Sequence, residues 1–195
     1  MAMNSESGNT VLKLWRLMHQ VRDILVLCED SVFAEYGITT EQFSVLAAVK
    51  SRDGSLRPTD LAYLLERSPN SISMLVDRMV KAGLVKRTRD RKDRRVVHVH
   101  LTTKGENALK PAMPASWEFI QKILSPMPYE DIYTLANQLE TVKCELLGYL
   151  NPEMDMTEIT KNSITNQPGL YNRMIKNIFP SGYKAKLQNG KKRAA

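Results

Sequence analysis

The amino-acid sequence predicts a mainly helical fold that contains one small β-hairpin, an α+β arrangement. Near both ends of the chain, apolar residues recur at alternating spacings of three and four, which is the period of a long helix with one apolar face. Between these segments, several short stretches carry helix start and stop signals. They are followed by a pair of β-branched segments of alternating polarity, which predict the hairpin.

The composition of the 195-residue chain is typical of a soluble globular protein, with 43% apolar and 25% charged residues. No segment is apolar over the length of a membrane span, and the first ten residues lack a signal-peptide pattern, so we expect a cytoplasmic protein. The two cysteines, Cys28 and Cys144, are too few for a disulfide framework and do not form a CxxC metal site.

The net charge of +7 is concentrated in two segments. Residues 86–95 (KRTRDRKDRR) hold seven Lys or Arg against two Asp, and residues 152–195 hold eight against three acids, so each segment carries +5. The rest of the chain is slightly acidic, at −3. A concentrated basic patch is typical of a protein that binds a polyanion, and nucleic acid is the first such partner to consider.

The first predicted element is a long helix within residues 10–36, and a matching helix is predicted near the end of residues 103–151. A narrow apolar seam needs a partner helix, so we predict that these two regions form a helical dimerisation region. The alternative is a monomeric bundle that buries both seams internally. The seam residues are Val11, Leu14, Met18, Val21, Leu25, Cys28 and Val32 in the first helix, and Ile132, Leu135, Leu139, Val142, Leu146 and Tyr149 in the second.

Residues 39–102 are predicted to form a separate lobe that opens with three short helices. The start signals are a capping box of Thr39 with Gln42, Pro58 in a first helical turn, and Ser68 capping a helix whose first residue is Pro69; the stop signals are Gly54 and Gly83. The second and third helices are separated by a tight Ser-Pro turn. They are therefore a helix-turn-helix candidate.

Two strands are predicted next, at residues 84–89 and 96–101, because both segments are β-branched and alternate in polarity. The basic loop between them, residues 90–95, makes a hairpin with a charged tip. Asp90 and Asp93 are expected to pair with neighbouring arginines and to fix the shape of this loop.

After the hairpin, Thr103 with Glu106 predicts a second capping box and a further helix. Pro111 and Pro114 are expected to bend that helix or make it restart. The chain ends in a polar, basic tail, residues 152–195, which is predicted to be partly disordered. A short amphipathic helix is predicted within the tail at residues 170–179, either docked on the body or following a phosphate backbone.

A helix-turn-helix followed by a basic hairpin is a winged helix-turn-helix, and its third helix has the width of a DNA major groove. The exposed start of that helix can reach bases and phosphates, and long cations on the hairpin can enter the minor groove or contact flanking phosphates. The alternative is a winged-helix protein- or RNA-interaction module with no DNA operator. The predicted DNA-binding residues are Ser68, Pro69, Asn70, Ser71, Ser73, Met74 and Arg78 on the helix, and Arg89, Arg91, Lys92, Arg94 and Arg95 on the hairpin.

Several short motifs occur together between Phe43 and Leu101: Leu61-Ala62, Ser68-Pro69-Asn70-Ser71, Leu75-Val76-Asp77-Arg78-Met79, Gly83-Leu84-Val85-Lys86-Arg87, Asp90-Arg91-Lys92-Asp93-Arg94-Arg95 and, at the end, Leu101-Thr102-Thr103-Lys104-Gly105. In these motifs the chain resembles the MarR family of bacterial transcriptional regulators. The flanking helical regions resemble the dimerisation helices of that family, so the resemblance covers residues 10–150.

The resemblance implies an obligate homodimer on a pseudo-palindromic double-stranded DNA operator, usually a repressor that is released by a small molecule, often an aromatic acid or phenol. It places residues 68–74 at the groove-reading positions, and it places Arg94 and Arg95 at the wing. The chain departs from the family pattern at Met74, where such helices often carry a polar or basic residue, and in the tail, which the resemblance does not reach.

An effector site is predicted at Trp15, His19 and Arg22, which lie on one stripe of the first helix at spacings of four and three. They combine an aromatic wall, a titratable donor and a cation suited to a carboxylate or phenolate. The alternative is interfacial packing with one salt bridge. Cys28 is interpreted as a buried apolar seam residue. The alternative, implied by the resemblance, is a cysteine-based redox-sensing regulator.

An enzyme is not predicted, because the sequence contains no GxSxG, HExxH, P-loop or GxGxxG motif. No cofactor and no metal site are predicted either. His98 and His100 alternate on one strand, and with no third ligand nearby they are interpreted as solvated strand histidines.

Overall fold

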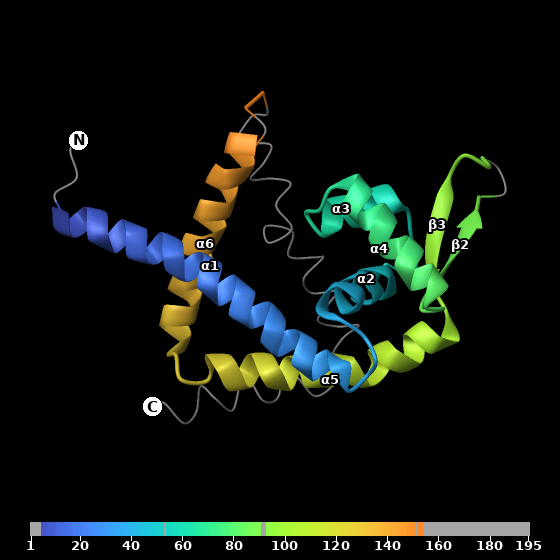
Figure 1. Ribbon diagram of the computed structural model, residues 1–195, viewed down its shortest axis with the longest axis horizontal. Helices are drawn as coiled ribbons and strands as arrows, with labels where there is room; N and C mark the ends of the chain where they lie inside the picture. The colour runs from blue at the N-terminus through green and yellow to red at the C-terminus, as the bar shows by residue number, and fades with distance from the viewer. Residues whose placement is uncertain (1–4, 53, 91–92, 151, 154–195) are drawn as a thin grey trace.

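The computed structural model describes residues 5–52, 54–90, 93–150 and 152–153 (Figure 1). The elements in chain order are α1 (Ser5–Ala34), α2 (Thr40–Ser51), β1 (Ser55–Leu56), α3 (Pro58–Leu64), α4 (Pro69–Lys81), β2 (Val85–Arg89), β3 (Val97–Leu101), α5 (Thr103–Leu124) and α6 (Tyr129–Leu150). The predicted mainly helical fold with a small β-sheet is confirmed. None of the described helices is both long and apolar enough to cross a membrane.

The sheet contains three antiparallel strands in the order β1-β3-β2, one more than the sequence predicts. The predicted hairpin is present as β2 and β3, which pair from Val85 opposite Leu101 to Arg89 opposite Val97. The additional strand, β1, pairs Ser55 with His100 on the other edge of β3. A strand of two residues is too short to show an alternating pattern, so its sequence carried no signal.

The predicted start signals of α2 and α4 are confirmed. Thr39 and Gln42 form the capping box at α2. At α4, the backbone N–H of Ser71 donates to Ser68 Oγ at 3.1 Å, which satisfies one of the unpaired donors at the helix start. Gly83 follows the end of α4 with a φ of +72°, a conformation that glycine adopts without strain.

The predicted second capping box is wrong, because α5 is capped by Thr102 and not by Thr103. The Thr102 hydroxyl accepts the backbone N–H of Gly105 at 3.1 Å, and it also lies 2.6 Å from the carbonyl oxygen of Gly83. A contact with a remote part of the chain thus favours Thr102, whereas a sequence pattern shows only neighbouring residues. Glu106, the expected partner in the box, forms an ion pair with a lysine of α2 instead.

The helix α5 continues without interruption through Pro111 and Pro114, so these prolines do not make it restart. Figure 1 shows the first part of α5, next to the hairpin, at an angle to the rest of the helix. A bend at proline is expected, because the ring displaces the preceding turn and removes one backbone donor.

The hydrophobic core lies inside the winged lobe, between α2, α3, α4, the sheet and the first half of α5. The end of α1 joins this core through Phe33, whose ring stacks on Phe43 with centroids 4.2 Å apart. Burying one side of α4 leaves its opposite side facing solvent. The largest fully buried side chains are Phe33, Leu46, Leu61, Ile72, Met79, Leu109, Val45, Val49, Val76, Val85 and Val99.

The apolar seams of α1 and α6 are largely uncovered in the single chain. Figure 1 shows both helices extending to the side of the molecule opposite the hairpin. No residue of α6 is buried, and Cys28, predicted to be buried in the α1 seam, is only partly buried. The exposed apolar residues of these two helices include Val11, Leu14, Trp15, Val21, Ile24, Leu25, Leu27, Leu135, Leu139, Leu146, Tyr149 and Leu150.

Candidate nucleic-acid interface

The helix α4 presents a polar face to solvent because its core-facing residues, Ile72, Leu75, Val76 and Met79, all lie on the opposite side. This exposed rod has the dimensions that a major groove accepts. Of the residues predicted on this helix to contact DNA, the structure places Ser68, Pro69, Asn70, Ser71, Met74 and Arg78 at exposed positions and Ser73 at a half-buried one.

Ser68 and Ser71 are linked to each other at the start of α4. Their hydroxyl oxygens lie 2.8 Å apart, in addition to the capping bond from the Ser71 backbone. Ser68 is therefore engaged in holding the helix start, and Ser71 is the member of the pair whose hydroxyl can be redirected without loss of the cap.

The hairpin β2–β3 projects beside α4 (Figure 1). The part of its tip that the structure describes carries three arginines. Arg89, Arg94 and Arg95 are exposed. Arg91 and Lys92, which were also predicted to contact DNA, lie outside the described residues. The exposed guanidinium groups are fixed positive charges that can be aimed at phosphates.

Two aspartates shape the loop at the hairpin tip by accepting backbone N–H groups. Asp90 Oδ1 accepts the N–H of Asp93 at 3.1 Å, and Asp93 Oδ1 accepts the N–H of Arg95 at 2.9 Å. Asp90 and Asp93 thus hold the shape of the loop, as predicted, but through hydrogen bonds from backbone N–H groups. The expected pairing with neighbouring arginines stays a prediction.

Arg87 on β2 connects the hairpin to α4, and sequence reasoning did not single it out. Its guanidinium forms an ion pair with Asp77, and its Nη2 donates to the backbone carbonyl of Ser73 at 3.4 Å. The sequence signal that was missed is an acidic residue in the second half of the predicted helix and a basic residue in the strand that follows Gly83.

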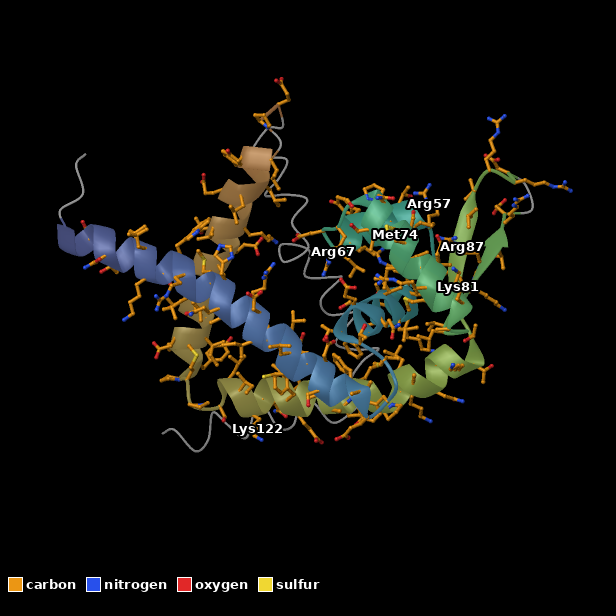
Figure 2. All side chains as sticks on the ribbon, viewed as in Figure 1. Arg57, Arg67, Met74, Lys81, Arg87 and Lys122 are labelled. Atoms are coloured by element: carbon orange, nitrogen blue, oxygen red, sulfur yellow. The ribbon has the colours of Figure 1, made fainter. Side chains whose placement is uncertain are left out.

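Two further cations near α4 were also missed: Arg57, which precedes α3, and Arg67, in the turn between α3 and α4 (Figure 2). Arg57 binds Asp60 through two hydrogen bonds, of 2.9 and 2.8 Å, and the Arg57 guanidinium lowers the pKa of the Asp60 carboxyl. Because Arg57 and Arg67 stand apart in the chain, no local charge run marks them.

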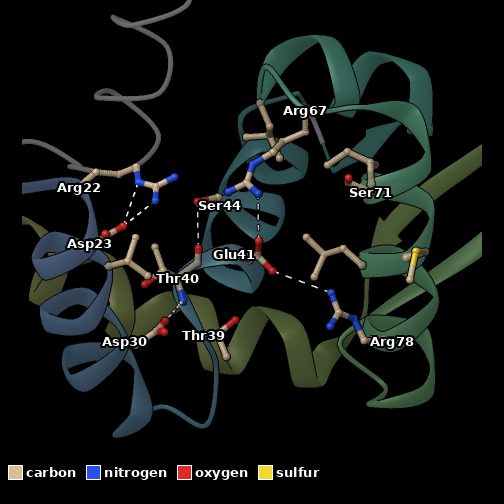
Figure 3. A pocket seen from close by; sticks show the side chains of 15 residues that line it. Arg22, Asp23, Asp30, Thr39, Thr40, Glu41, Ser44, Arg67, Ser71 and Arg78 are labelled. Carbon is tan, nitrogen blue, oxygen red and sulfur yellow. Dashed lines mark hydrogen bonds and ion pairs between the residues drawn. The ribbon is translucent and has the colours of Figure 1, made fainter. Parts of the chain in front are cut away.

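A cavity of about 780 Å³ lies between α1, α2 and α4 (Figure 3). It is lined by Arg22, from the predicted effector stripe, and by Ser71, Met74 and Arg78 of α4. The cavity therefore shares residues with the predicted DNA-contacting face.

Glu41, in the first turn of α2, bridges two arginines that line this cavity. Its Oε1 lies 3.0 Å from a guanidinium nitrogen of Arg67, and its Oε2 lies 3.9 Å from one of Arg78 (Figure 3). The bridge connects α2, the turn between α3 and α4, and α4 itself across the cavity.

The predicted effector stripe is divided between two cavities. Trp15 lines a second cavity, of about 620 Å³, between α1 and α6, whereas Arg22 lines the first. The ring of His19 contacts Trp15 edge-on, with centroids 5.4 Å apart, and Arg22 pairs with its neighbour Asp23 at 2.6 Å. The structure does not bring the three residues together around one ligand.

Both strand histidines lie within hydrogen-bond distance of a hydroxyl group, and His98 Nε2 also lies 3.9 Å from Asp90 Oδ2. His98 Nδ1 lies 3.3 Å from Ser55 Oγ, and His100 Nε2 lies 2.8 Å from Thr88 Oγ1. Within the part of the chain that the structure describes, no three His, Cys, Asp or Glu side chains are grouped to hold a metal ion.

Comparison with known proteins places this geometry in a family. Residues 36–96, from the start of the lobe to the tip of the hairpin, match the model of the MarR family. The multiple antibiotic resistance protein MarR of Escherichia coli (strain K12) is 30% identical over 105 residues, which are 54% of this chain and 72% of that protein. The transcriptional repressor MdtR of Bacillus subtilis (strain 168) is 30% identical over 101 residues, which are 52% of this chain and 64% of the repressor, slightly less than two thirds of its length.

Solved structures agree with the fold. A cysteine-to-serine mutant of E. coli MarR, crystallised with operator DNA, is similar with a TM-score of 0.63 and 25% identity, covering 69% of this chain and 96% of that one. The organohalide-sensing regulator RdhR-CbdbA1625 in its 2,4-dichlorophenol-bound form has a TM-score of 0.68 at 22% identity, covering 76% and 89%, a likeness of fold alone.

The helix pair α3–α4 and the cationic hairpin thus define a winged helix-turn-helix, the DNA-binding unit of a transcriptional regulator. The chain belongs to the MarR family of transcriptional regulators.

Proposed function

We propose that the chain is a cytoplasmic, homodimeric repressor that binds a pseudo-palindromic operator and is released by a small aromatic acid or phenol. The observation that carries the proposal is the exposed polar face of α4, held beside a cationic hairpin by Arg87. Contacts to phosphates position a protein on DNA, and contacts to base edges recognise the sequence. A winged helix-turn-helix makes both kinds of contact when its helix and its hairpin lie side by side.

On the operator, the start of α4 enters the major groove, where Asn70 can pair with adenine and Ser71 can contact a base or phosphate. Arg94 and Arg95 reach the adjacent minor groove or flanking phosphates. The basic tail, residues 152–195, adds phosphate contacts that do not depend on sequence. Its residues from 154 onward lie outside the described ones.

The exposed seams of α1 and α6 support a homodimer. Exposed apolar surface of this extent is unfavourable in water, and a second copy offers matching seams that cover it. Two copies related by a two-fold axis then present two α4 helices. Their half-sites are expected about 10 bp apart, or a multiple of that distance.

The cavity between α1, α2 and α4 is the place where we propose that an effector binds. It lies between α1, one of the proposed dimerisation helices, and the DNA-binding helix α4, so a ligand there contacts both. The 2,4-dichlorophenol-bound form of RdhR-CbdbA1625 supports a phenolic ligand on this fold. Of the predicted effector residues, Arg22 is the one that lines this cavity.

Footprinting on the DNA that flanks the coding region, repeated with salicylate as a phenolic acid, tests the proposal. We expect a protected two-fold site that salicylate releases, a dimer in sedimentation analysis, and an affinity that falls linearly in log salt. A monomeric protein, or a protein that leaves duplex DNA unprotected at low salt, would overturn the proposal. Stronger binding to RNA than to duplex would favour the RNA-interaction alternative.

A further inference from the structure

Met74 is an apolar side chain on the polar face of α4. It is 58% exposed, more than any other Ile, Leu, Val or Met of that helix. It lies one turn after Asn70 and one turn before Arg78, so the three residues share a stripe of the helix surface. Figure 2 labels Met74 on α4.

The fold of the lobe does not require a methionine at this position. The core is filled by the other side of α4, and an exposed apolar side chain between polar and charged neighbours gains little in water. A site that contacts DNA can make use of this residue. Its three rotatable side-chain bonds let the thioether adapt to an irregular surface.

The chemistry of methionine restricts what it can recognise. A thioether donates no hydrogen bond and is a weak acceptor, so it has no means of distinguishing the polar edges of bases or of holding a phosphate. The apolar group that base edges display in the major groove is the C5 methyl of thymine.

We infer that Met74 contacts the C5 methyl group of a thymine in each operator half-site and thereby raises the affinity for operators with thymine at that position. The inference rests on the proposed binding of α4 in the major groove. It adds a specificity-determining residue that acts through apolar contact, next to the hydrogen-bonding positions Asn70 and Ser71.

Replacing thymine by deoxyuridine tests this contact, because the exchange removes the methyl group and leaves the base pair intact. Duplexes are first selected from a random library with the wild-type protein. Each thymine of the selected half-site is then exchanged, and dissociation constants are measured by fluorescence anisotropy at fixed salt. We expect one position at which the exchange weakens wild-type binding about three- to fivefold per half-site, the effect of one buried methyl group.

The Met74→Ala variant should bind the selected duplex more weakly and should lose its sensitivity to the exchange at that position. Met74→Leu, which keeps an apolar side chain, should retain it. Asn70→Ala is the matched control on the same stripe, because it should weaken binding while keeping the deoxyuridine penalty.

The inference is overturned if Met74→Ala keeps the full deoxyuridine penalty, or if no position responds to the exchange. An unchanged penalty together with weaker salicylate binding would assign Met74 to the cavity that it also lines. If the library yields no preferred duplex, the proposed function itself fails. If only the inference fails, the library still yields a preferred duplex, but removing the thymine methyl groups does not change its affinity for the protein.

Discussion

The guanidinium of Arg87 in β2 is paired with the carboxylate of Asp77 in α4, so the hairpin is attached to the DNA-facing helix by a contact outside the hydrophobic core. The same guanidinium also reaches the backbone carbonyl of Ser73, 3.4 Å away and about one turn earlier in the helix. Contacts with two successive turns of α4 restrict the angle between helix and hairpin. That angle decides whether both elements reach one DNA duplex together.

Removing this pair should weaken DNA binding more than it weakens the fold. For Asp77→Asn or Arg87→Met we expect a loss in unfolding free energy of about 1 kcal/mol, because both side chains are partly exposed to solvent. On operator affinity, a double-mutant cycle should give a coupling energy between about 0.5 and 3 kcal/mol. Lys86→Met, at the adjacent strand position, is the control and should show no coupling with Asp77. Additive effects of Asp77→Asn and Arg87→Met would argue against the attachment.

The wing arginines should act through phosphates. Replacing Arg94 or Arg95 by alanine should lower the slope of log affinity against log salt by about one unit each, because one released counterion is lost with each contact. The dimer should remain intact. Lys122→Ala removes an exposed lysine near the end of α5, away from the hairpin (Figure 2), and should leave the slope unchanged. If the Arg94 and Arg95 variants keep the wild-type slope, as the Lys122 variant should, the wing does not contact phosphates.

The parts of the fold that were predictable from sequence are those specified by neighbouring residues. The caps at Thr39 and Ser68 and the stop at Gly83 each depend on contacts within four or five positions, and the structure confirms them. The hairpin was predictable for the same reason, since alternating polarity is a local pattern.

The features that escaped sequence reasoning depend on distant contacts. The hydroxyl of Thr102, and not that of Thr103, caps α5. Thr102 also donates a hydrogen bond to the carbonyl oxygen of Gly83, a residue too far away in the chain for a local sequence pattern to reveal. The spacing of Trp15 and Arg22 correctly predicted that they lie on one helix. In the structure, however, Trp15 lines the cavity next to α6, whereas Arg22 lines the cavity next to α4. The partner helices, and not the stripe, decide what each residue faces.

Gly105 should not accept a larger residue without a loss of stability, because the backbone of Leu84 lies against it. A Cβ atom added there would lie 2.1 Å from the backbone oxygen of Leu84 and 3.2 Å from Leu46 Cδ2, so α5 and the start of the sheet would have to separate. We expect Gly105→Ala to lower the unfolding free energy by about 1–3 kcal/mol or more, in spite of alanine's higher helix propensity. Denaturant titration measures the change.

Gly8→Ala is the matched control, because nothing lies within 4 Å of an added Cβ at this position in α1. Here the same exchange should stabilise the helix by up to about 1 kcal/mol. An equal effect of the two exchanges would show that α5 and Leu84 do not approach as closely as the structure indicates.

Glu29 should make the stability depend on pH. Burial in the second half of α1, and to a lesser extent the neighbouring Asp30, raise the pKa of the Glu29 carboxyl. The folded state therefore binds a proton at a pH where the unfolded state has already lost it. This contribution to stability falls as the pH rises from the ordinary glutamate value through the raised pKa. Above that range the folded chain carries a poorly hydrated carboxylate.

Glu29→Gln removes this charge, so we expect the variant to be more stable than wild type at pH 8 and the gain to shrink toward pH 4. Thermal unfolding at several pH values measures the difference. Glu35→Gln, at an exposed position just after α1, is the control and should show no such trend. A gain that is the same at every pH would mean that glutamine acts by packing or helix propensity, and that Glu29 is not a site of proton uptake in the folded protein.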